Sequence, residues 1–269
     1  MPVNDGKRLT GPETSLPYSV FSSSPKEERG GRREGRGAEQ HRKVFLSTGV
    51  ISQAQGSAYV EQGRTKVMAG VWGPREVQRR SDFSMSGSLT AEFKFAPFAR
   101  RGQRLGSSGG GGGSEEELGL VVSEALSSTV CLDKYPKSVL EVGVTVLEDD
   151  GSVLAAALTA AGLALAAAGV HMADLVVGVK VGLREGEGEG SLLVDPEASE
   201  EEGGEAGLVV GYLPSLDQVV SCVSQGVLSP AGLSTALAAA TQQAAVLLPA
   251  VQQELVQIFK KKKLRDNQH

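Results

Sequence analysis

A run of alanine, leucine and other small apolar residues between Gly151 and Ala168 dominates the middle of this chain. If the run is a helix, it is apolar on every side, and such a helix is stable only where other elements cover it. The run is also too short to cross a lipid bilayer. We therefore expect a buried core helix, approached closely by its neighbours, and no membrane-spanning segment.

Segments with the alternation typical of strands flank this helix on both sides. They cover residues 44–51, 56–62, 65–72, 89–95, 139–147 and 174–183. Gly63 supplies the turn of a hairpin between the second and third strands, and Gly73-Pro74 is expected to end the third. Ser114 and Glu117 form a capping box that predicts the start of a further helix. Because strands and helices do not alternate regularly, the pattern indicates a mixed α/β or α+β fold.

Charge and composition divide the chain into five parts. Residues 1–42 predict a disordered basic tail, because they contain too few apolar side chains to offset the entropy of ordering. Residues 43–185 form the first expected domain, and the acidic segment 186–206 links it to a second domain at 207–262 that ends in a long helix. A short basic tail, 263–269, follows. The glycine- and serine-rich segment 106–114 is expected to be a flexible loop.

Several classes of site are excluded by the residues that such sites need. The histidines at positions 41, 171 and 269 lie too far apart for a zinc site, and the two cysteines, Cys131 and Cys222, form no metal-binding pair. Three glutamates, and no lysine, follow the glycine run 109–113, so it is not a phosphate loop. We expect no metal and no cofactor. The polar first residues predict no secretory signal, and free thiols fit a soluble intracellular protein.

Two clusters of basic residues follow predicted strands and are candidates for RNA contact. One contains Arg75, Arg79 and Arg80, and the other contains Lys94, Arg100, Arg101 and Arg104. Arginine matches phosphate geometry and stacks on bases. Since both clusters follow strands, we expect them at one edge of the sheet. The net charge of −5 means that any nucleic acid contact must be local. The alternative interpretation is a pair of solvated surface loops.

An ordered series of motifs resembles RNase PH domains. It comprises residues 56–67, 71–74 and 95–99, then 135–138, 146–152, 155–161 and 164–170, and finally 174–178 and 193–196. The order resembles the RNase PH-like ring subunits of the eukaryotic RNA exosome over roughly residues 44–260. The resemblance implies an RNase PH-like fold, in which a mixed sheet packs with helices. It also implies that the Ala-rich helix is the central helix of this fold.

The resemblance also predicts which activity is absent. In phosphorolytic members, the segment that enters the central helix reads Asp-Gly-Gly-Thr/Ser-Arg, and its arginine helps to bind the attacking phosphate at the helix start. Here the segment is Asp150 to Leu154, and Leu154 falls where that arginine should stand. Asp195 and Glu201 match the spacing of the two acidic residues of active members. A magnesium ion is conceivable there, but we expect a solvated acidic loop.

We therefore expect a non-catalytic subunit that helps to build a hetero-hexameric ring and to guide RNA through its channel. The resemblance implies other RNase PH-like exosome subunits, an RNA-binding cap subunit, RNA and an associated hydrolytic nuclease as partners. It implies the nucleus, nucleolus and cytoplasm as locations. One alternative is an active phosphate-dependent 3′-to-5′ exoribonuclease that borrows an arginine, such as Arg100 or Arg101. Another is a stand-alone binding module.

Overall fold

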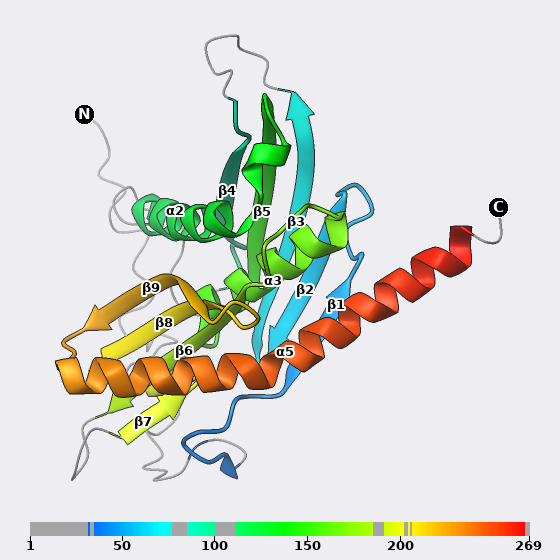
Figure 1. Ribbon diagram of the computed structural model, residues 1–269. Helices are drawn as coiled ribbons and strands as arrows, with labels where there is room; N and C mark the ends of the chain where they lie inside the picture. Colours follow the sequence, from blue (N-terminus) through cyan, green and yellow to red (C-terminus); the bar gives the residue numbers. More distant parts are fainter. Residues whose placement is uncertain are drawn as a thin grey trace, which may run out of the picture. The chain divides into compact units, whose positions relative to one another are not determined.

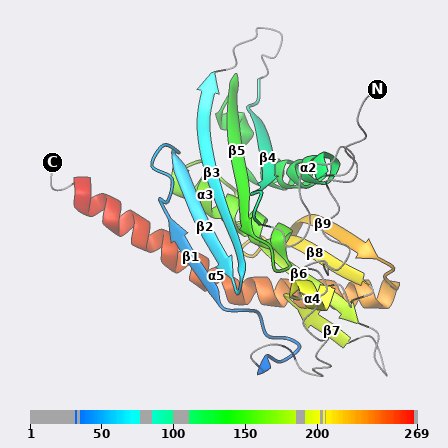
Figure 2. The same ribbon diagram turned by 180° about the vertical axis from the view of Figure 1, so that it is seen from behind.

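Two β-sheets and the helices between and beside them make up the structure, a computed structural model (Figures 1 and 2). The structure describes residues 32, 35–76, 85–99, 111–184, 191–201, 204 and 206–266. A compact unit begins at Ala38, and everything below concerns that unit.

The first sheet has the strand order β1-β2-β3-β5-β4. Its strands are β1 (Val44–Thr48), β2 (Gly56–Gln62), β3 (Thr65–Glu76), β4 (Ser88–Phe95) and β5 (Ser138–Glu148). Only the β4–β5 pair is parallel. Gly63 has a φ of 60°, a left-handed conformation that glycine adopts readily, so the expected hairpin between β2 and β3 is confirmed.

The second sheet is antiparallel throughout, with the order β7-β6-β8-β9. It contains β6 (Val177–Arg184), β7 (Ser191–Val194), β8 (Ala206–Leu213) and β9 (Gln218–Gly226). We expected β6 to belong with the first group of strands, whereas it pairs with β8. The strand β7 lies in the segment that we interpreted as an acidic linker, where Leu192-Leu193-Val194 supply its apolar residues.

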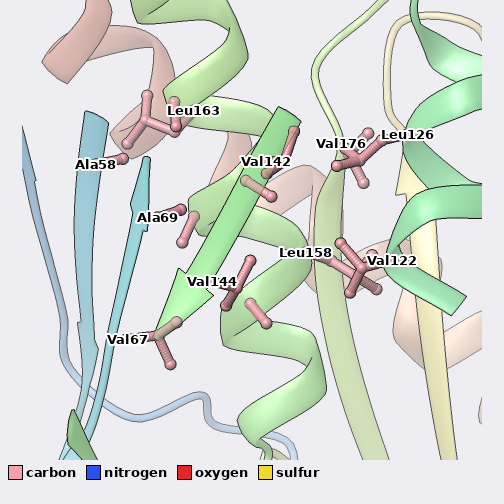
Figure 3. Close-up of a cluster of buried hydrophobic side chains, with 14 of the residues drawn as sticks. Ala58, Val67, Ala69, Val122, Leu126, Val142, Val144, Leu158, Leu163 and Val176 are labelled. Carbon is pink, nitrogen blue, oxygen red and sulfur yellow. The ribbon is translucent and has the colours of Figure 1, made fainter. Parts of the chain in front are cut away.

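The central helix α3 (Val153–Ala168) is buried along most of its length, as its composition predicts. Figure 3 shows Leu163 of α3 beside Ala58 of β2. Nearer the start of α3, Leu158 lies beside Val122 of α2 (Gly111–Thr129). Glycines bring both sheets against its backbone. A Cβ added to Gly56 would lie 2.3 Å from the Ala164 carbonyl oxygen, and one added to Gly178 would lie 2.2 Å from that of Ala155. The packing of α3 between two sheets gives the α+β architecture that the sequence predicts.

The helix α5 (Pro230–Asp266) covers the other face of the second sheet. Its residues Ala236, Ala240, Ala244 and Leu247 pack against buried valines of β6. By length and composition, α5 is also the one helix of the described chain apolar enough to cross a membrane. Packing against a sheet is a second explanation for that composition. The remaining short helices are η4 (Leu132–Lys134) and α4 (Ala198–Glu201).

Two element boundaries differ from those that the sequence predicts. The strand β3 continues past Gly73-Pro74, because a register shift between Trp72 and Arg75 accommodates the proline without ending the pairing with β5. The helix α2 begins at Gly111, so Ser114 lies inside the helix and is not its N-cap.

Candidate functional site at the start of α3

Arg42 lies at the start of α3 and is buried, although the sequence places it in a disordered tail. Its side chain is only 3% exposed. The guanidinium donates to Asp195 through Nε (2.7 Å to Oδ2) and Nη2 (2.6 Å to Oδ1). It also donates to the hydroxyl of Thr65 and to the carbonyl oxygens of Asp150 and Gly151. A guanidinium has five N–H groups, and these contacts use all of them.

Asp195 is the anion that faces this guanidinium, and it is 1% exposed. It follows β7 with a φ of 50°, and its backbone N–H donates to the Lys180 carbonyl oxygen at 2.8 Å. Burial by itself would raise the pKa of the Asp195 carboxyl. The hydrogen bonds from Arg42, with the nearby His41 and Arg42 charges, reverse this effect and lower the pKa to about 2.

A second carboxylate, Glu201, sits directly on the first turn of α3. Its Oε1 accepts a hydrogen bond from the Ser152 backbone N–H at 2.7 Å. The same oxygen forms an ion pair with Lys180 Nζ, also at 2.7 Å. Ser152 occupies the N-cap position, but its hydroxyl donates to the Pro196 carbonyl oxygen and does not cap the helix. Glu201 therefore supplies the negative charge that a helix N-terminus favours.

The segment from Asp195 to Glu201 closes over this helix start. The backbone N–H of Ala198 donates to the Asp150 carbonyl oxygen at 3.1 Å. A Cβ on Gly151 would lie 2.7 Å from both Ala198 N and the Pro196 carbonyl oxygen, so the two segments touch through backbone atoms. Beside this contact, a pocket of about 150 Å³ is lined by residues that include Lys180 and Glu201.

The arrangement leaves little capacity to bind an external anion. Leu154 lies in the first turn of α3, is 7% exposed and belongs to the hydrophobic core. Among the residues that the structure describes, Arg42 brings a guanidinium to the helix start, and every donor of that guanidinium is engaged within the chain. The Ser152 N–H and the Lys180 ammonium both bind Glu201. An incoming phosphate would have to displace these internal partners.

The two acidic residues with the spacing of a metal pair are held by cations of the chain. Asp195 binds Arg42, and Glu201 binds Lys180. Glu197, between them, is also buried. Our expectation of a solvated acidic loop is therefore wrong for Asp195 and Glu197. Burial without a cation would be too costly for Asp195, and Arg42 provides that cation.

Arg75 and Lys94, the two candidate RNA-binding residues that the structure describes, do not lie at one edge of the first sheet. Arg75 lies opposite Val139 of β5, whereas Lys94 lies opposite Thr145. At 3.3 Å per residue these positions are roughly 20 Å apart along β5. For these two residues the expectation is wrong, because β3 runs antiparallel to β5 and β4 runs parallel to it, so β3 and β4 end at opposite ends of the sheet. Arg79, Arg80, Arg100, Arg101 and Arg104 lie outside the described residues.

Both described members of these clusters are exposed and paired. Arg75 Nη1 lies 3.1 Å from Glu141 Oε2, and Lys94 forms an ion pair with Glu92.

Sequence reasoning missed Arg42 and Lys180. Arg42 stands next to a basic segment, and no local spacing connects it with residue 195. Lys180 gave a usable signal, because it is a charged residue inside the apolar run Val176–Val181. A cation in such a run requires a buried or half-buried partner.

The fold and this site define an RNase PH-type protein, and comparisons with known families agree. The model of domain 1 of the 3′ exoribonuclease family matches residues 40–171, and that of domain 2 matches residues 174–243. The chain belongs to this family.

Among its relatives are the exosome complex components MTR3 of Homo sapiens and Mus musculus. The human protein is 39% identical over 274 aligned residues, which cover 96% of this chain and 97% of the relative. The mouse protein is 40% identical, covering 82% and 83%. The exosome component Rrp41 of the archaeon Pyrobaculum neutrophilum is 42% identical, covering 70% and 74%.

Solved structures of the same fold include an Archaeoglobus fulgidus exosome with RNA bound to the active site. Its matching chain has a TM-score of 0.68 and 28% identity, covering 82% of this chain and 92% of its own length. Rice Rrp46 has a TM-score of 0.73 at 23% identity, covering 83% of this chain and 99% of its own, a likeness of fold alone.

Proposed function

We propose that this protein is a non-catalytic subunit of an exosome core ring. In this role it pairs with other RNase PH-like subunits and helps to conduct RNA towards a nuclease elsewhere in the complex. Identity of 39–40% to exosome components over most of the chain supports the assignment to a ring. The partners are the remaining RNase PH-like subunits, an RNA-binding cap subunit, RNA and a hydrolytic nuclease.

The observation that carries the loss of catalysis is the occupied start of α3. Phosphorolysis needs a bound phosphate, and phosphoryl transfer is catalysed mainly by positioning and charge stabilisation. Here the Ser152 backbone N–H donates to Glu201. The N–H groups of Arg42 donate to Asp195, to the Thr65 hydroxyl and to two backbone carbonyl oxygens. We propose in addition that Leu154 stands where active relatives have their phosphate-binding arginine.

Arg42 bears directly on the alternative of an active enzyme, which requires a guanidinium near the helix start. Such a guanidinium is present, opposite Asp195. The Arg42 guanidinium is buried and forms an ion pair with the Asp195 carboxylate. It therefore stabilises the fold and is not accessible to phosphate. An active enzyme would therefore need a cation from another part of the chain or from a neighbouring subunit.

A phosphorolysis assay tests the proposal. The full-length chain is incubated with 3′-labelled single-stranded RNA, magnesium and inorganic phosphate, and nucleoside diphosphates are measured. We expect no phosphate-dependent release above a blank without protein. Phosphate-dependent release that the substitution D195N abolishes would overturn the loss of catalysis, whether or not the chain belongs to a ring.

Assembly is tested separately, by affinity purification of the full-length chain followed by mass spectrometry. We expect other RNase PH-like chains in stoichiometric amounts. Recovery of a stable monomer alone would instead identify a stand-alone module. We further propose that the protein works in the nucleus, nucleolus and cytoplasm, which imaging of the tagged chain would test.

A further inference from the structure

The strand β9 forms one border of the second sheet and is nine residues long. It contains no charged residue and no proline between Gln218 and Gly226. A strand at the edge of a sheet presents unpaired backbone N–H and C=O groups, and proteins protect such edges with charge, proline, short length or a covering element. The sequence of β9 supplies none of the first three, so its edge depends on a covering element.

The edge strand β4 of the first sheet has such a cover. Two side chains of α2 bond its backbone directly. The Phe95 N–H donates to Glu115 at 3.2 Å, and the Ser123 hydroxyl donates to the Leu89 carbonyl oxygen at 3.1 Å. The β4 edge is therefore closed by the chain itself.

The edge strands β7 and β1 are short and lie beside other segments. β7 has four residues, and the Val194 N–H donates to the Ala38 carbonyl oxygen at 2.9 Å. β1 has five residues, and α5 runs beside it, where the Thr48 hydroxyl donates to Glu254 at 3.1 Å. β9 is thus the long edge strand among the four, and the question is what covers it.

The pairing of the second sheet shows which backbone groups of β9 point outwards. The Asp195 N–H donates to the Lys180 carbonyl oxygen, so the backbone of Lys180 faces β7 and its neighbours in β6 face β8. In antiparallel strands this alternation passes through the register from β6 to β8 and from β8 to β9. It turns the backbone of Val223 towards β8 and leaves the N–H and C=O groups of Cys222 and Ser224 at the outer edge.

These outward-facing groups are open. Cys222 and Ser224 are both exposed, and no hydrogen bond from the described part of the chain reaches their backbone groups at the outer edge. Val220 and Val223 pack inwards against the main hydrophobic cluster. The strand is therefore fixed in position by its inner side chains while its edge remains available for pairing.

We propose that the outer edge of β9 pairs with a strand of a neighbouring RNase PH-like subunit, through the backbone groups of Cys222 and Ser224. This inference rests on the proposed membership of a ring and names a surface through which the ring is built. Main-chain hydrogen bonds give affinity in strand addition without any charged group, which suits a strand that has none. The second sheet then continues into the neighbour.

The chemistry of β9 favours a folded subunit over a free peptide or RNA. Free peptides that add to an edge are selected through pockets for alternate side chains, whereas the exposed side chains of Cys222 and Ser224 are small. A strand that is already ordered in a folded neighbour also loses less conformational entropy on pairing. RNA needs cations for its phosphates, and β9 has none.

Hydrogen exchange tests the proposal with the unaltered full-length chain, alone and in complex with the RNase PH-like chain that copurifies with it. Exchange is resolved to single amides by fragmentation in the mass spectrometer. In the chain alone, the Val223 amide should be protected by β8, and those of Cys222 and Ser224 should exchange rapidly. In the complex, we expect both outer amides to become protected. Unchanged exchange of both in a stable complex would overturn this inference and leave the proposed function intact.

Proline substitution gives a second, independent measurement. S224P removes an outward N–H that the sheet of this chain does not use, and proline is tolerated at such edge positions. S224A is the matched control, because it alters the same side chain and retains the N–H. We expect S224P, but not S224A, to lose the copurifying RNase PH-like chain, with equal melting temperatures of the two isolated variants.

Each remaining outcome also decides the question. Retention of the RNase PH-like chain by folded S224P contradicts the proposal, and if S224P does not fold, the exchange measurement on the parent decides. Protection of Cys222 and Ser224 in the isolated chain as its concentration rises would identify a second copy as the occupant and overturn the proposal. If the parent recovers no RNase PH-like chain, the proposed function and this inference fail together.

Discussion

Arg42 and Asp195 form an ion pair that is almost completely excluded from water, and each is the main partner of the other. Removing one member of such a pair leaves an uncompensated buried charge. We expect R42A to lower the free energy of unfolding by about 3 to 5 kcal/mol, measured by urea denaturation. The loss should be large because Asp195 is 1% exposed and cannot regain water without a rearrangement of the segment 195–201.

The exposed ion pair between Arg75 and Glu141 provides the control. Their side chains are 59% and 52% exposed, and solvent screens such pairs. R75A should change the free energy of unfolding by less than about 1 kcal/mol. Equal losses for R42A and R75A would show that the buried pair does not stabilise the fold.

Asp195 also makes a defined contribution to the pH dependence of stability. Its pKa falls from 3.8 to about 2 on folding, so the folded state holds the charged form more strongly than the unfolded state does. The resulting stability, about 2 kcal/mol, is present above roughly pH 4 and is lost as the pH falls through 2. The stability difference between the parent and D195N should therefore shrink from pH 5 to pH 2. A constant difference over this range would contradict the assignment.

At the scale of the elements, glycines set how closely α3 and the sheets approach. A Cβ on Gly178 of β6 would overlap the Ala155 backbone, whereas one on Gly207 of β8 would stand 3.5 Å from the Lys180 side chain. We expect G178A to destabilise the protein by about 3 kcal/mol or to prevent folding, since backbone cannot move aside as a side chain can. G207A should cost less than about 1 kcal/mol in the same thermal or urea measurement. A tolerated G178A would show that α3 can shift away from β6.

Elements with a local sequence signal could be predicted, whereas elements defined by contacts between distant residues could not. The all-apolar composition of α3 identifies its burial, and the alternation around Gly63 identifies the hairpin, because both signals are local. The pairing of β6 with β8 depends on residues far apart in the chain and leaves no local pattern. The strand β7 was missed because Leu192-Leu193-Val194 is short and stands among acidic residues.

The residues of the site at the start of α3 also differ in whether a local motif identifies them. The motif that enters α3 locates Leu154, and the spacing after β7 locates Asp195 and Glu201. What occupies the site depends on Arg42, which is brought there by the fold and not by any neighbouring motif. The carboxylates then differ from a solvated loop because two cations, Arg42 and Lys180, compensate their burial.

At the scale of the whole molecule, apolar side chains remain exposed on several elements. Phe45 on β1 is 59% exposed and Val227 after β9 is 91% exposed. Single exposed apolar side chains are common on proteins without partners, so the expectation of neighbours rests on the assignment to a ring. We expect the isolated chain to aggregate at concentrations where the complex with its RNase PH-like partners stays monodisperse in light scattering. A chain that is equally monodisperse alone would speak against obligatory partners.

The separation of Arg75 from Lys94 on the first sheet leads to a final prediction about RNA in the assembled ring. Arg75 lies roughly 20 Å from Lys94 along β5 and is paired with Glu141, so it should not act together with the cluster that follows β4. R100E/R101E should reduce the protection of RNA from nuclease digestion several-fold without dissociating the ring, because reversed charges repel the phosphate backbone. R75E should leave protection unchanged, and the triple variant should match R100E/R101E. Equal losses from R75E and R100E/R101E would place Arg75 and the Arg100–Arg101 pair on one RNA path, despite the separation of Arg75 from Lys94 on the sheet.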